Sequence, residues 1–295
     1  MVKANGISPA KEIMGMAKIT GVMASTHTPG LLGWFEDAPK DQQEAARKAF
    51  AEMRDYMAKC RANVMIIVSN DHLLNWPINN SPDYTVGIGS EHVGPADWYD
   101  SWLGQKEKYH VSGHPGLACH IVNASARLGV SMSYLREMQF DDGISVPTCW
   151  LNPDSEISLI PITLNCNIPP IPTSESAYKT GLVLHKVIEE YPGDDRVVLV
   201  GSGGLSHEPG GPRYFYIDDD FDRWFMGLIA EGDHEKILRE CTLERMEEAG
   251  SGGTAELIAW ILVMASTQGP AKILNYVKSY SWRCASGWVV WPNVR

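Results

Sequence analysis

The chain has 295 residues, of which 44% are hydrophobic and 21% are charged, a composition typical of a folded globular protein and not of a disordered one. Its 25 basic and 36 acidic side chains give a formal net charge of −11. A chain this acidic lacks the cationic surface that nucleic acids and anionic membranes attract, so we expect no partner of either class. Its apolar runs fall short of the roughly 20 residues that cross a bilayer, and its start lacks the apolar stretch of a signal peptide. We therefore expect a cytoplasmic protein.

Apolar segments alternate with amphipathic ones after an N-terminal arm, residues 1–17, which we expect to be loosely attached. Continuous apolar runs predict buried strands, and apolar residues at helical spacing predict helices. In chain order we expect a strand over 19–24, a helix over 41–60, a strand over 64–68, a helix over 116–127, strands over 131–135 and 157–164, a helix over 174–190 and a strand over 196–200. The last quarter is expected to be mostly helical, with an interruption at 250–253. This order predicts the α/β class, with residues 18–295 forming a single domain whose central mixed sheet is flanked by helices on both faces.

Three histidines share one position in this pattern, because His27, His72 and His207 each follow the end of an apolar strand by a few residues. The carboxyl ends of parallel strands face the ligand crevice of an α/β sheet, so side chains just beyond those ends converge. We therefore take the three as a candidate site. The alternative is that they are ordinary turn residues, as the pairs Asp71-His72 and Ser206-His207 would allow.

Glu256 supplies a candidate carboxylate for the same site. It stands directly before the strongly apolar run 257–264, where a buried charge is costly unless it is paired or binds a cation. The alternative is a first-turn glutamate favoured by the helix dipole. Two histidines and one carboxylate form the facial triad of non-haem Fe(II) oxygenases, which leaves positions open for substrate and dioxygen.

Four short motifs lie between residues 25 and 257. They are Ser25-Thr26-His27-Thr28-Pro29, Asn70-Asp71-His72, Gly203-Gly204-Leu205-Ser206-His207-Glu208-Pro209 and Gly253-Thr254-Ala255-Glu256-Leu257. In order and spacing the chain resembles the class II (LigB-type) extradiol ring-cleavage dioxygenases, which include the catalytic subunit of protocatechuate 4,5-dioxygenase. The resemblance implies that residues 18–295 are a LigB-type catalytic domain. It also implies that His27, His72 and Glu256 bind Fe(II) and that His207 is the active-site acid/base.

One stretch departs from the family's pattern. The resemblance implies a second active-site histidine just before a glycine, and the corresponding stretch here is Gln139-Phe140-Asp141-Asp142-Gly143, with Asp142 in the histidine's place. Asp142 is therefore a catalytic candidate, and the alternative is a plain turn. His114 and His120, nearby in the sequence, are the stand-ins for that histidine and hence candidate substrate-binding residues. An anionic Asp142 would disfavour an anionic substrate group beside it and favour a donor such as a ring N–H, an amine or a hydroxyl, which argues against a protocatechuate-like substrate.

The expected activity is Fe(II)-dependent extradiol cleavage of a catechol-like, aminophenol-like or hydroxypyridone-like ring by O2. Ser206 is a further substrate-binding candidate, as a group that stabilises an oxyanion. Two other functions stay open: a Zn-dependent hydrolase that uses the same histidines and glutamate, and a non-catalytic subunit of a dioxygenase complex. The family resemblance also implies a homo-oligomer, or an assembly with a small helical second subunit.

An aromatic cluster, Trp98, Tyr99, Trp102 and Tyr109, has two interpretations. It forms either the wall of a flat aromatic pocket or an oligomer contact or part of the core, since Trp and Tyr are common in all these settings. We favour the contact or core here.

Overall fold

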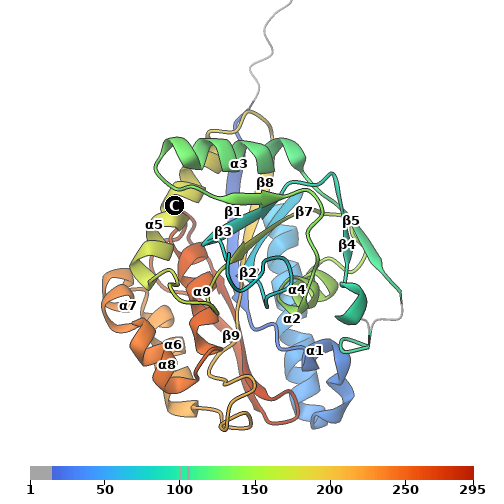
Figure 1. The fold of residues 1–295 in the computed structure, drawn as a ribbon, viewed down its shortest axis with the longest axis vertical. Helices are drawn as coiled ribbons and strands as arrows, with labels where there is room; N and C mark the ends of the chain where they lie inside the picture. Colours follow the sequence, from blue (N-terminus) through green and yellow to red (C-terminus); the bar gives the residue numbers. More distant parts are fainter. Residues whose placement is uncertain (1–14, 100, 105–106) are drawn as a thin grey trace, which may run out of the picture.

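The centre of the fold is a sheet of eight strands, in a computed structural model that describes residues 15–99, 101–104 and 107–295. The order of the strands is β6-β3-β7-β2-β8-β1-β10-β9 (Figure 1). Their bounds are β1 (Lys18–Ser25), β2 (Val64–Asn70), β3 (Tyr84–Gly87), β6 (Ser133–Leu135), β7 (Ser158–Leu164), β8 (Arg196–Ser202), β9 (Lys272–Ser279) and β10 (Cys284–Trp291). A separate antiparallel pair consists of β4 (Glu91–Gly94) and β5 (Tyr109–Ser112).

Four parallel strands, β7, β2, β8 and β1, form the middle of the sheet. Antiparallel strands flank them, because β3 pairs with β7 on one side and β10 with β1 on the other. Central parallel strands are covered on both faces and therefore carry apolar residues throughout. In β2, Val64, Ile66 and Val68 face one hydrophobic core, whereas Met65 and Ile67 face the other.

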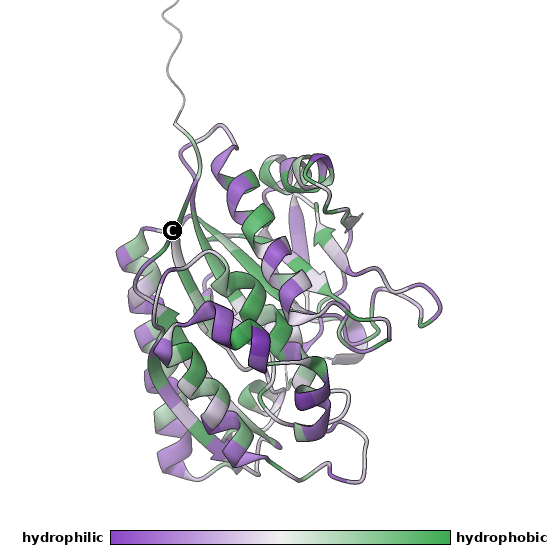
Figure 2. Cartoon of the chain, turned by 90° about the vertical axis from the view of Figure 1, so that its left-hand side faces the viewer, coloured by the Kyte–Doolittle hydropathy of each residue, from purple (hydrophilic) through white to green (hydrophobic). Residues whose placement is uncertain are grey.

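Helices cover both faces of the sheet. They are α1 (Gly30–Gly33), α2 (Lys40–Cys60), α3 (Pro115–Arg127), α4 (Asp142–Leu151), α5 (Ser174–Glu189), α6 (Asp219–Glu231), α7 (His234–Glu240), α8 (Leu243–Ala249) and α9 (Leu257–Met264). α2 and α4 pack on one face, and α3, α5 and α9 on the other. α9 lies between the sheet and α5, which explains why all eight of its residues are apolar and buried. In Figure 2 the green apolar segments lie in the interior, and purple segments mark the outer helices. The predicted α/β domain with a mixed sheet between helices is confirmed.

The prediction for the last quarter was wrong in part. Helices α6 to α9 are present, but the chain then forms β9 and β10, an antiparallel hairpin on the edge of β1. β10 is buried along its whole length and contains Trp288 and Trp291, residues that favour strands when they pack on a half-buried surface. The hairpin turn spans 280–283, where the Arg283 amide donates to the Tyr280 carbonyl at 3.2 Å. This hairpin becomes a wall of the site described below.

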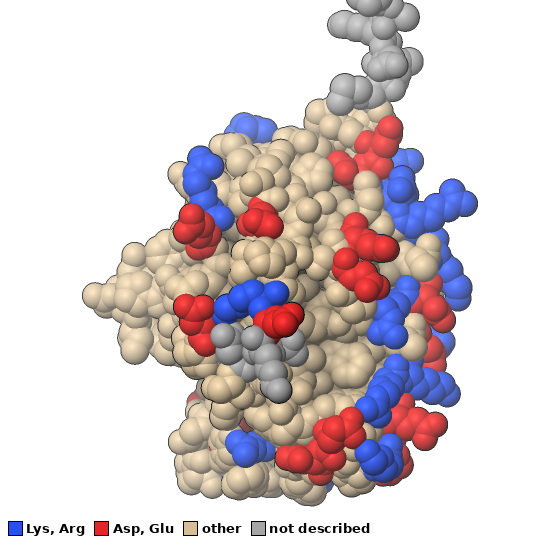
Figure 3. All heavy atoms as spheres, turned by 90° about the vertical axis from the view of Figure 1, so that its right-hand side faces the viewer, with Lys and Arg blue, Asp and Glu red and all other residues tan. Residues whose placement is uncertain are grey.

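The two ends and the surface complete the description. Residues 1–14 of the predicted N-terminal arm lie outside the described residues, and at its described end the Ala17 amide donates to the Tyr191 carbonyl at 2.9 Å. Within the described ranges, no helix has both the length and the apolar character that crossing a bilayer requires. On the face in Figure 3, blue basic and red acidic side chains are interleaved.

Candidate active site

Three adjacent parallel strands bring the three histidines together. His27 follows β1, His72 follows β2 and His207 follows β8, and these strands are neighbours in the order β2-β8-β1. Because they are parallel, their carboxyl ends lie at the same edge of the sheet. His27 is buried, whereas the side chains of His72 and His207 keep 25% and 18% of their exposure. The sequence predicts that these side chains converge, and the structure brings all three to one edge of the sheet.

Glu256 lies at the centre of the three imidazoles. It ends a short 3₁₀ turn, Thr254–Glu256, directly before α9, and is only 2% exposed. Its carboxylate oxygens lie 3.1 Å from His27 Nε2, 3.2 Å from His72 Nε2 and 3.7 Å from His207 Nε2. Burial raises the pKa of Glu256, but the imidazoles of His27 and His207 lower it further, so the net pKa lies well below the usual value. The carboxylate is ionised.

Two hydrogen bonds hold this carboxylate in place. The amide of Gly204 donates to Glu256 Oε2 at 2.6 Å, and Asn70 Nδ2 donates to Oε1 at 3.0 Å. A Cβ on residue 204 would overlap the His207 ring and lie 3.0 Å from Glu256 Oε2, so only glycine lets the backbone approach this closely. The Gly-Gly-Leu-Ser-His motif thus positions the glutamate as well as the histidine.

The outer nitrogens of His27 and His72 are fixed by hydrogen-bond acceptors. His27 Nδ1 lies 3.0 Å from Ser202 Oγ, whose own hydroxyl donates to the Gly143 carbonyl at 2.7 Å, so the serine oxygen accepts from the imidazole. His72 Nδ1 lies 2.9 Å from Asp141 Oδ2. Burial raises the pKa of Asp141, but His72 lowers it to a net value below normal, so this oxygen is an ionised acceptor. Both Nδ1 atoms therefore carry hydrogen, and both Nε2 atoms face the glutamate, where each can hold either a proton or a metal ion.

This donor set fits a divalent transition metal. A lone pair on Nε2 that faces a carboxylate oxygen about 3 Å away is repulsive unless a proton or a cation lies between them. Two imidazole nitrogens and one carboxylate are the ligands that non-haem Fe(II) enzymes use, and acceptors on the far ring nitrogens are the usual support of metal-binding histidines. The pKa of His72 reflects the negative charge around it. Burial lowers this pKa, but Asp142 and Asp141 raise it well above the usual value.

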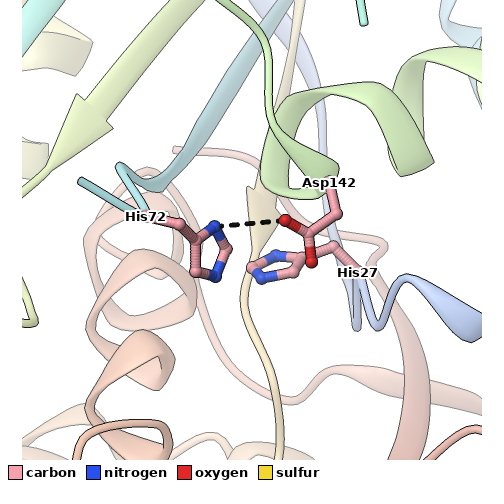
Figure 4. Close-up of side chains that lie close together, drawn as sticks. All are labelled: His27, His72 and Asp142. Carbon is pink, nitrogen blue, oxygen red and sulfur yellow. Dashed lines mark ion pairs between the residues drawn. The ribbon is translucent and has the colours of Figure 1, made fainter. Parts of the chain in front are cut away.

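Asp142 is the second carboxylate of the cluster. His27, His72 and Asp142 offer ligand atoms that all lie within 4.8 Å of one another, and Figure 4 shows Asp142 pointing at His72. Its Oδ1 lies 3.2 Å from His72 Nδ1, the nitrogen that faces away from Glu256. Glu256 is therefore better placed than Asp142 to share a metal ion with both Nε2 atoms. Burial raises the pKa of Asp142, and the negative charges of Asp141 and Glu256 raise it too. His72 and His27 lower it, but the net pKa lies above the usual value of an aspartate.

His207 is oriented as a proton carrier. Its Nδ1 lies 2.7 Å from the Leu205 carbonyl, which only accepts, so Nδ1 carries hydrogen and Nε2 is the nitrogen that takes up and releases a proton. Burial lowers the pKa of His207, but Cys284 and Glu256 raise it well above the ordinary value. An imidazole with this orientation readily accepts a proton from a neighbouring group.

A cavity of about 320 Å³ opens above this cluster. Its size suits a substituted aromatic ring. Its polar lining includes His27, His72, His207, Glu256 and Asp142, and its aromatic lining consists of Trp34, Trp98, Tyr99, Trp102, Tyr214 and Trp282.

The aromatic cluster lies mostly at this cavity, and the interpretation as core holds for Tyr99, which is buried with Ala96 and Leu103. Trp98, Tyr99 and Trp102 line the cavity. Tyr109 does not, since its hydroxyl donates to Ser145 at 2.9 Å beneath the β4–β5 pair.

Three residues predicted to bind substrate are not brought to the cavity. His114 caps α3, where its Nδ1 accepts from the Leu117 amide at 3.1 Å. His120 Nε2 donates to the Val187 carbonyl at 3.0 Å. Ser206 is fully buried and both its amide and its hydroxyl donate to Asp222. All three side chains are held by hydrogen bonds elsewhere in the fold, and none of them is among the residues that line the cavity.

Sequence reasoning missed several residues of the site. Asp141 and Ser202 orient the two histidines, and Arg283 and Cys284 line the cavity from the β9–β10 hairpin. For Asp141 a signal existed, since an aspartate before Asp142-Gly143 is a typical helix N-cap and its side chain caps α4.

Comparisons with known proteins identify the family of the chain. The sequence profile of the family described as "Catalytic LigB subunit of aromatic ring-opening dioxygenase" matches residues 21–290. Gallate dioxygenase of Pseudomonas putida is 31% identical over 156 residues, which are 52% of this chain and 45% of that protein. A 2,3-dihydroxyphenylpropionate/2,3-dihydroxicinnamic acid 1,2-dioxygenase of Photorhabdus laumondii is 26% identical over 230 residues, 78% of this chain and 68% of that protein. The chain thus spans less than half the length of the first of these relatives.

A solved structure supports the fold. An uncharacterized protein of Escherichia coli K12 superposes with a TM-score of 0.51 at 14% identity, covering 81% of this chain and 90% of the other. The family profile spans all four motifs. The chain belongs to the family of catalytic LigB subunits of aromatic ring-opening dioxygenases.

Proposed function

We propose that this protein is a non-haem Fe(II)-dependent extradiol dioxygenase that opens a catechol-like, aminophenol-like or hydroxypyridone-like ring with O2. The observation that carries the proposal is the convergence of His27 Nε2 and His72 Nε2 on the buried carboxylate of Glu256, at 3.1 and 3.2 Å. Membership of a ring-opening dioxygenase family makes oxygen chemistry the use of this donor set that we favour over zinc-dependent hydrolysis.

His27, His72 and Glu256 would hold the Fe(II). Bound there, the ion would acidify a ring hydroxyl and leave adjacent positions for the ring and for dioxygen. Ser202 and Asp141 keep the two imidazoles in the tautomer that leaves Nε2 free.

His207 would carry the proton of the reaction. Its Nε2 faces the same carboxylate as the two proposed ligands, so a ring hydroxyl bound at the cluster lies beside it. Because Nδ1–H is donated to the Leu205 carbonyl, Nε2 accepts the proton and returns it during ring opening. The aromatic wall, with Trp282 fully buried at its base, keeps water away and orients the ring.

Asp142 would select among ring substituents. It lines the cavity beside His72 and next to Tyr99, whose pKa is raised by burial and by Asp142 and Asp141. A carboxylic group at this position accepts from an amine, a ring N–H or a hydroxyl and disfavours an anion directly beside it.

An oxygen electrode tests the proposed function. The full chain is reconstituted anaerobically with Fe(II) and screened against vicinal diols, aminophenols and hydroxypyridones, with the zinc-loaded chain as the matched control. We expect ring-dependent oxygen uptake with iron alone and a product that contains both atoms of O2. Hydrolysis that persists without oxygen in the zinc-loaded chain would contradict the proposal.

The assembly and the location of the protein are further proposals. The family membership favours a homo-oligomer or a complex with a small helical second subunit, in a cytoplasmic protein that binds a small aromatic substrate and O2. Light scattering of the purified chain, alone and with any co-purifying subunit, measures the assembly.

A further inference from the structure

Asp222 is a buried carboxyl group that the proposed reaction does not use. It lies in the first turn of α6, is fully buried, and is not among the described residues that line the cavity. The neighbouring Arg223 pairs with Asp219 at 3.0 Å, so the basic side chain next to it in the sequence is already taken. A buried carboxyl group is costly to a fold unless its hydrogen bonds compensate for the lost hydration. Those hydrogen bonds therefore indicate its role.

The carboxyl group of Asp222 holds Ser206 through both of its oxygens. The Ser206 amide donates to Oδ1 at 2.7 Å, and the Ser206 hydroxyl donates to Oδ2 at 3.0 Å. The hydroxyl oxygen in turn accepts from the Asp218 amide at 2.8 Å. A third donor, the Tyr276 hydroxyl, lies 3.3 Å from Oδ2. Because Ser206 directly precedes His207, α6 fixes the backbone beside the proposed proton carrier.

One peptide group connects Asp222 to the imidazole of His207. It lies between Leu205 and Ser206. Its N–H donates to Asp222 Oδ1 and its C=O accepts from His207 Nδ1, each at 2.7 Å. A peptide group is planar, and its N–H and C=O point in opposite directions, so the carboxyl group and the imidazole lie at its two ends. A peptide whose N–H donates to a carboxylate is polarised, and its carbonyl becomes a stronger acceptor.

The orientation of the His207 ring depends on this carbonyl. Cys284 Sγ lies 3.9 Å from the same oxygen, too far to compete with the imidazole at 2.7 Å. The backbone amide of His207 donates to Thr254 Oγ1 at 3.4 Å, which fixes the main chain but not the direction of the ring. The Leu205 carbonyl is therefore the contact that turns Nδ1 inward.

We propose that Asp222 is a positioning residue for His207 and acts through this peptide group. By fixing and polarising the Leu205 carbonyl, it holds hydrogen on Nδ1 and keeps Nε2 directed at Glu256, 3.7 Å away. We call Asp222, the peptide group and the His207 ring the relay. In a catalytic triad the aspartate accepts from Nδ1 directly, whereas here a backbone group lies between them. The inference rests on the proposed function for the role of His207 as proton carrier.

Nuclear magnetic resonance of the full chain, free of metal and labelled with ¹⁵N at histidine, tests the relay without any reaction. Long-range ¹H–¹⁵N correlation records the shift of Nδ1, which differs between a nitrogen that carries hydrogen and one that does not. The spectrum of His207→Gln assigns the signal. Spectra are recorded at about pH 9, where Asp222 is ionised because burial raises its pKa only to about 7.

Two variants weaken the relay by different amounts. Asp222→Asn keeps an oxygen that accepts from the Ser206 amide but removes the negative charge, and Asp222→Ala removes the acceptor altogether. The matched control is Asp218→Asn, the same chemical change at the N-cap of the same helix, outside the relay.

We expect Nδ1 of His207 to carry hydrogen in the wild type and in Asp218→Asn. Asp222→Asn moves the ¹⁵N shift of Nδ1 part of the way toward that of a bare ring nitrogen, and Asp222→Ala moves it further, because the partner is first weakened and then lost. In the iron-loaded chain, Asp222→Asn lowers kcat by roughly threefold to tenfold and leaves KM unchanged, since it affects the proton carrier and not the binding of the ring.

Three results would overturn the relay. They are an unchanged Nδ1 shift in both Asp222 variants, an equal change in Asp218→Asn, or a lower melting temperature of the Asp222 variants with no change at His207, which would assign Asp222 to stability alone. Should Asp222→Ala fail to fold, as judged by its circular dichroism, the Nδ1 shift of Asp222→Asn decides.

Failure of the proposed function gives a different result. The change of the Nδ1 shift in the Asp222 variants would then persist while no ring supports oxygen uptake. Oxygen uptake by the iron-loaded wild type, together with an Nδ1 shift that does not depend on Asp222, would overturn only the relay.

Discussion

Asp141→Asn tests how the protein arranges its proposed metal ligands. Asp141 Oδ2 accepts from both the backbone amide and Nδ1 of His72, each at 2.9 Å. Asparagine keeps the size of the side chain but removes the charge and can turn an N–H toward Nδ1. The imidazole then loses the acceptor that keeps its Nε2 lone pair directed at Glu256.

The size of the effect follows from this contact. Loss of the acceptor behind a metal-binding histidine weakens metal affinity by about tenfold to a hundredfold, which is roughly 1.4 to 2.7 kcal/mol. Asp141 also caps α4 through the Ile144 amide at 3.4 Å, and asparagine caps a helix about as well as aspartate, so the variant keeps this cap. The matched control is Asp218→Asn, because Asp218 caps α6 through the Phe221 amide at 3.0 Å.

Anaerobic competition with a chromophoric chelator measures the Kd for Fe(II), and urea unfolding measures stability. We expect both variants to keep nearly the stability of the wild type and only Asp141→Asn to lose iron affinity. Equal iron affinity in Asp141→Asn and wild type would refute the reasoning that this carboxylate orients His72. Equal losses of affinity in both variants would assign the effect to helix capping.

Three further predictions use other parts of the structure. His207→Ala should keep the iron affinity of the wild type and lower kcat by about 10² to 10⁴-fold, the usual value of a proton carrier; full turnover in an oxygen-electrode assay would disprove its role. Gly204→Ala should reduce iron content and the melting temperature together, because the added Cβ overlaps the His207 ring and crowds Glu256; unchanged iron by elemental analysis would argue against it. Burial raises the pKa of Asp222 to about 7, so the folded state holds a proton that the unfolded state releases near pH 4. Between pH 4 and 7 this group should therefore lower the free energy of unfolding by up to about 1.4 kcal/mol for each unit that the pH rises. Urea unfolding at several pH values measures this slope, and Asp222→Asn should remove the contribution of Asp222 to it.

The sequence predicts that the proposed metal ligands lie close together, and it does so for a physical reason. A strand buried on both faces is a continuous apolar run, and a polar residue just past its end is easily recognised, as with His27 after β1 and His72 after β2. Parallel pairing then places those residues at one edge. Glu256 was found in the same way, because a carboxylate directly before the buried helix α9 stands out.

The substrate end was harder to predict. Arg283 reaches the cavity only because β9 and β10 fold back on β1, a long-range pairing that leaves no local signal. His114 looked like a site residue from its neighbourhood in the sequence, yet it caps α3 and faces Asp195. Local patterns identify polar residues but do not show which of them serve only as caps.

The hydrogen-bond ladder of β1, β8 and β2 has a consequence for how this protein can diversify. Neighbouring strands in a ladder lie about 4.8 Å apart, a spacing fixed by backbone chemistry and independent of side chains. The separation of the strands that carry His27 and His72 is thus set by the main chain, whereas the cavity wall comes from an edge hairpin and surface loops. Exchanging the tip of the β9–β10 hairpin should therefore change which rings are accepted and leave the proposed oxygen chemistry unchanged.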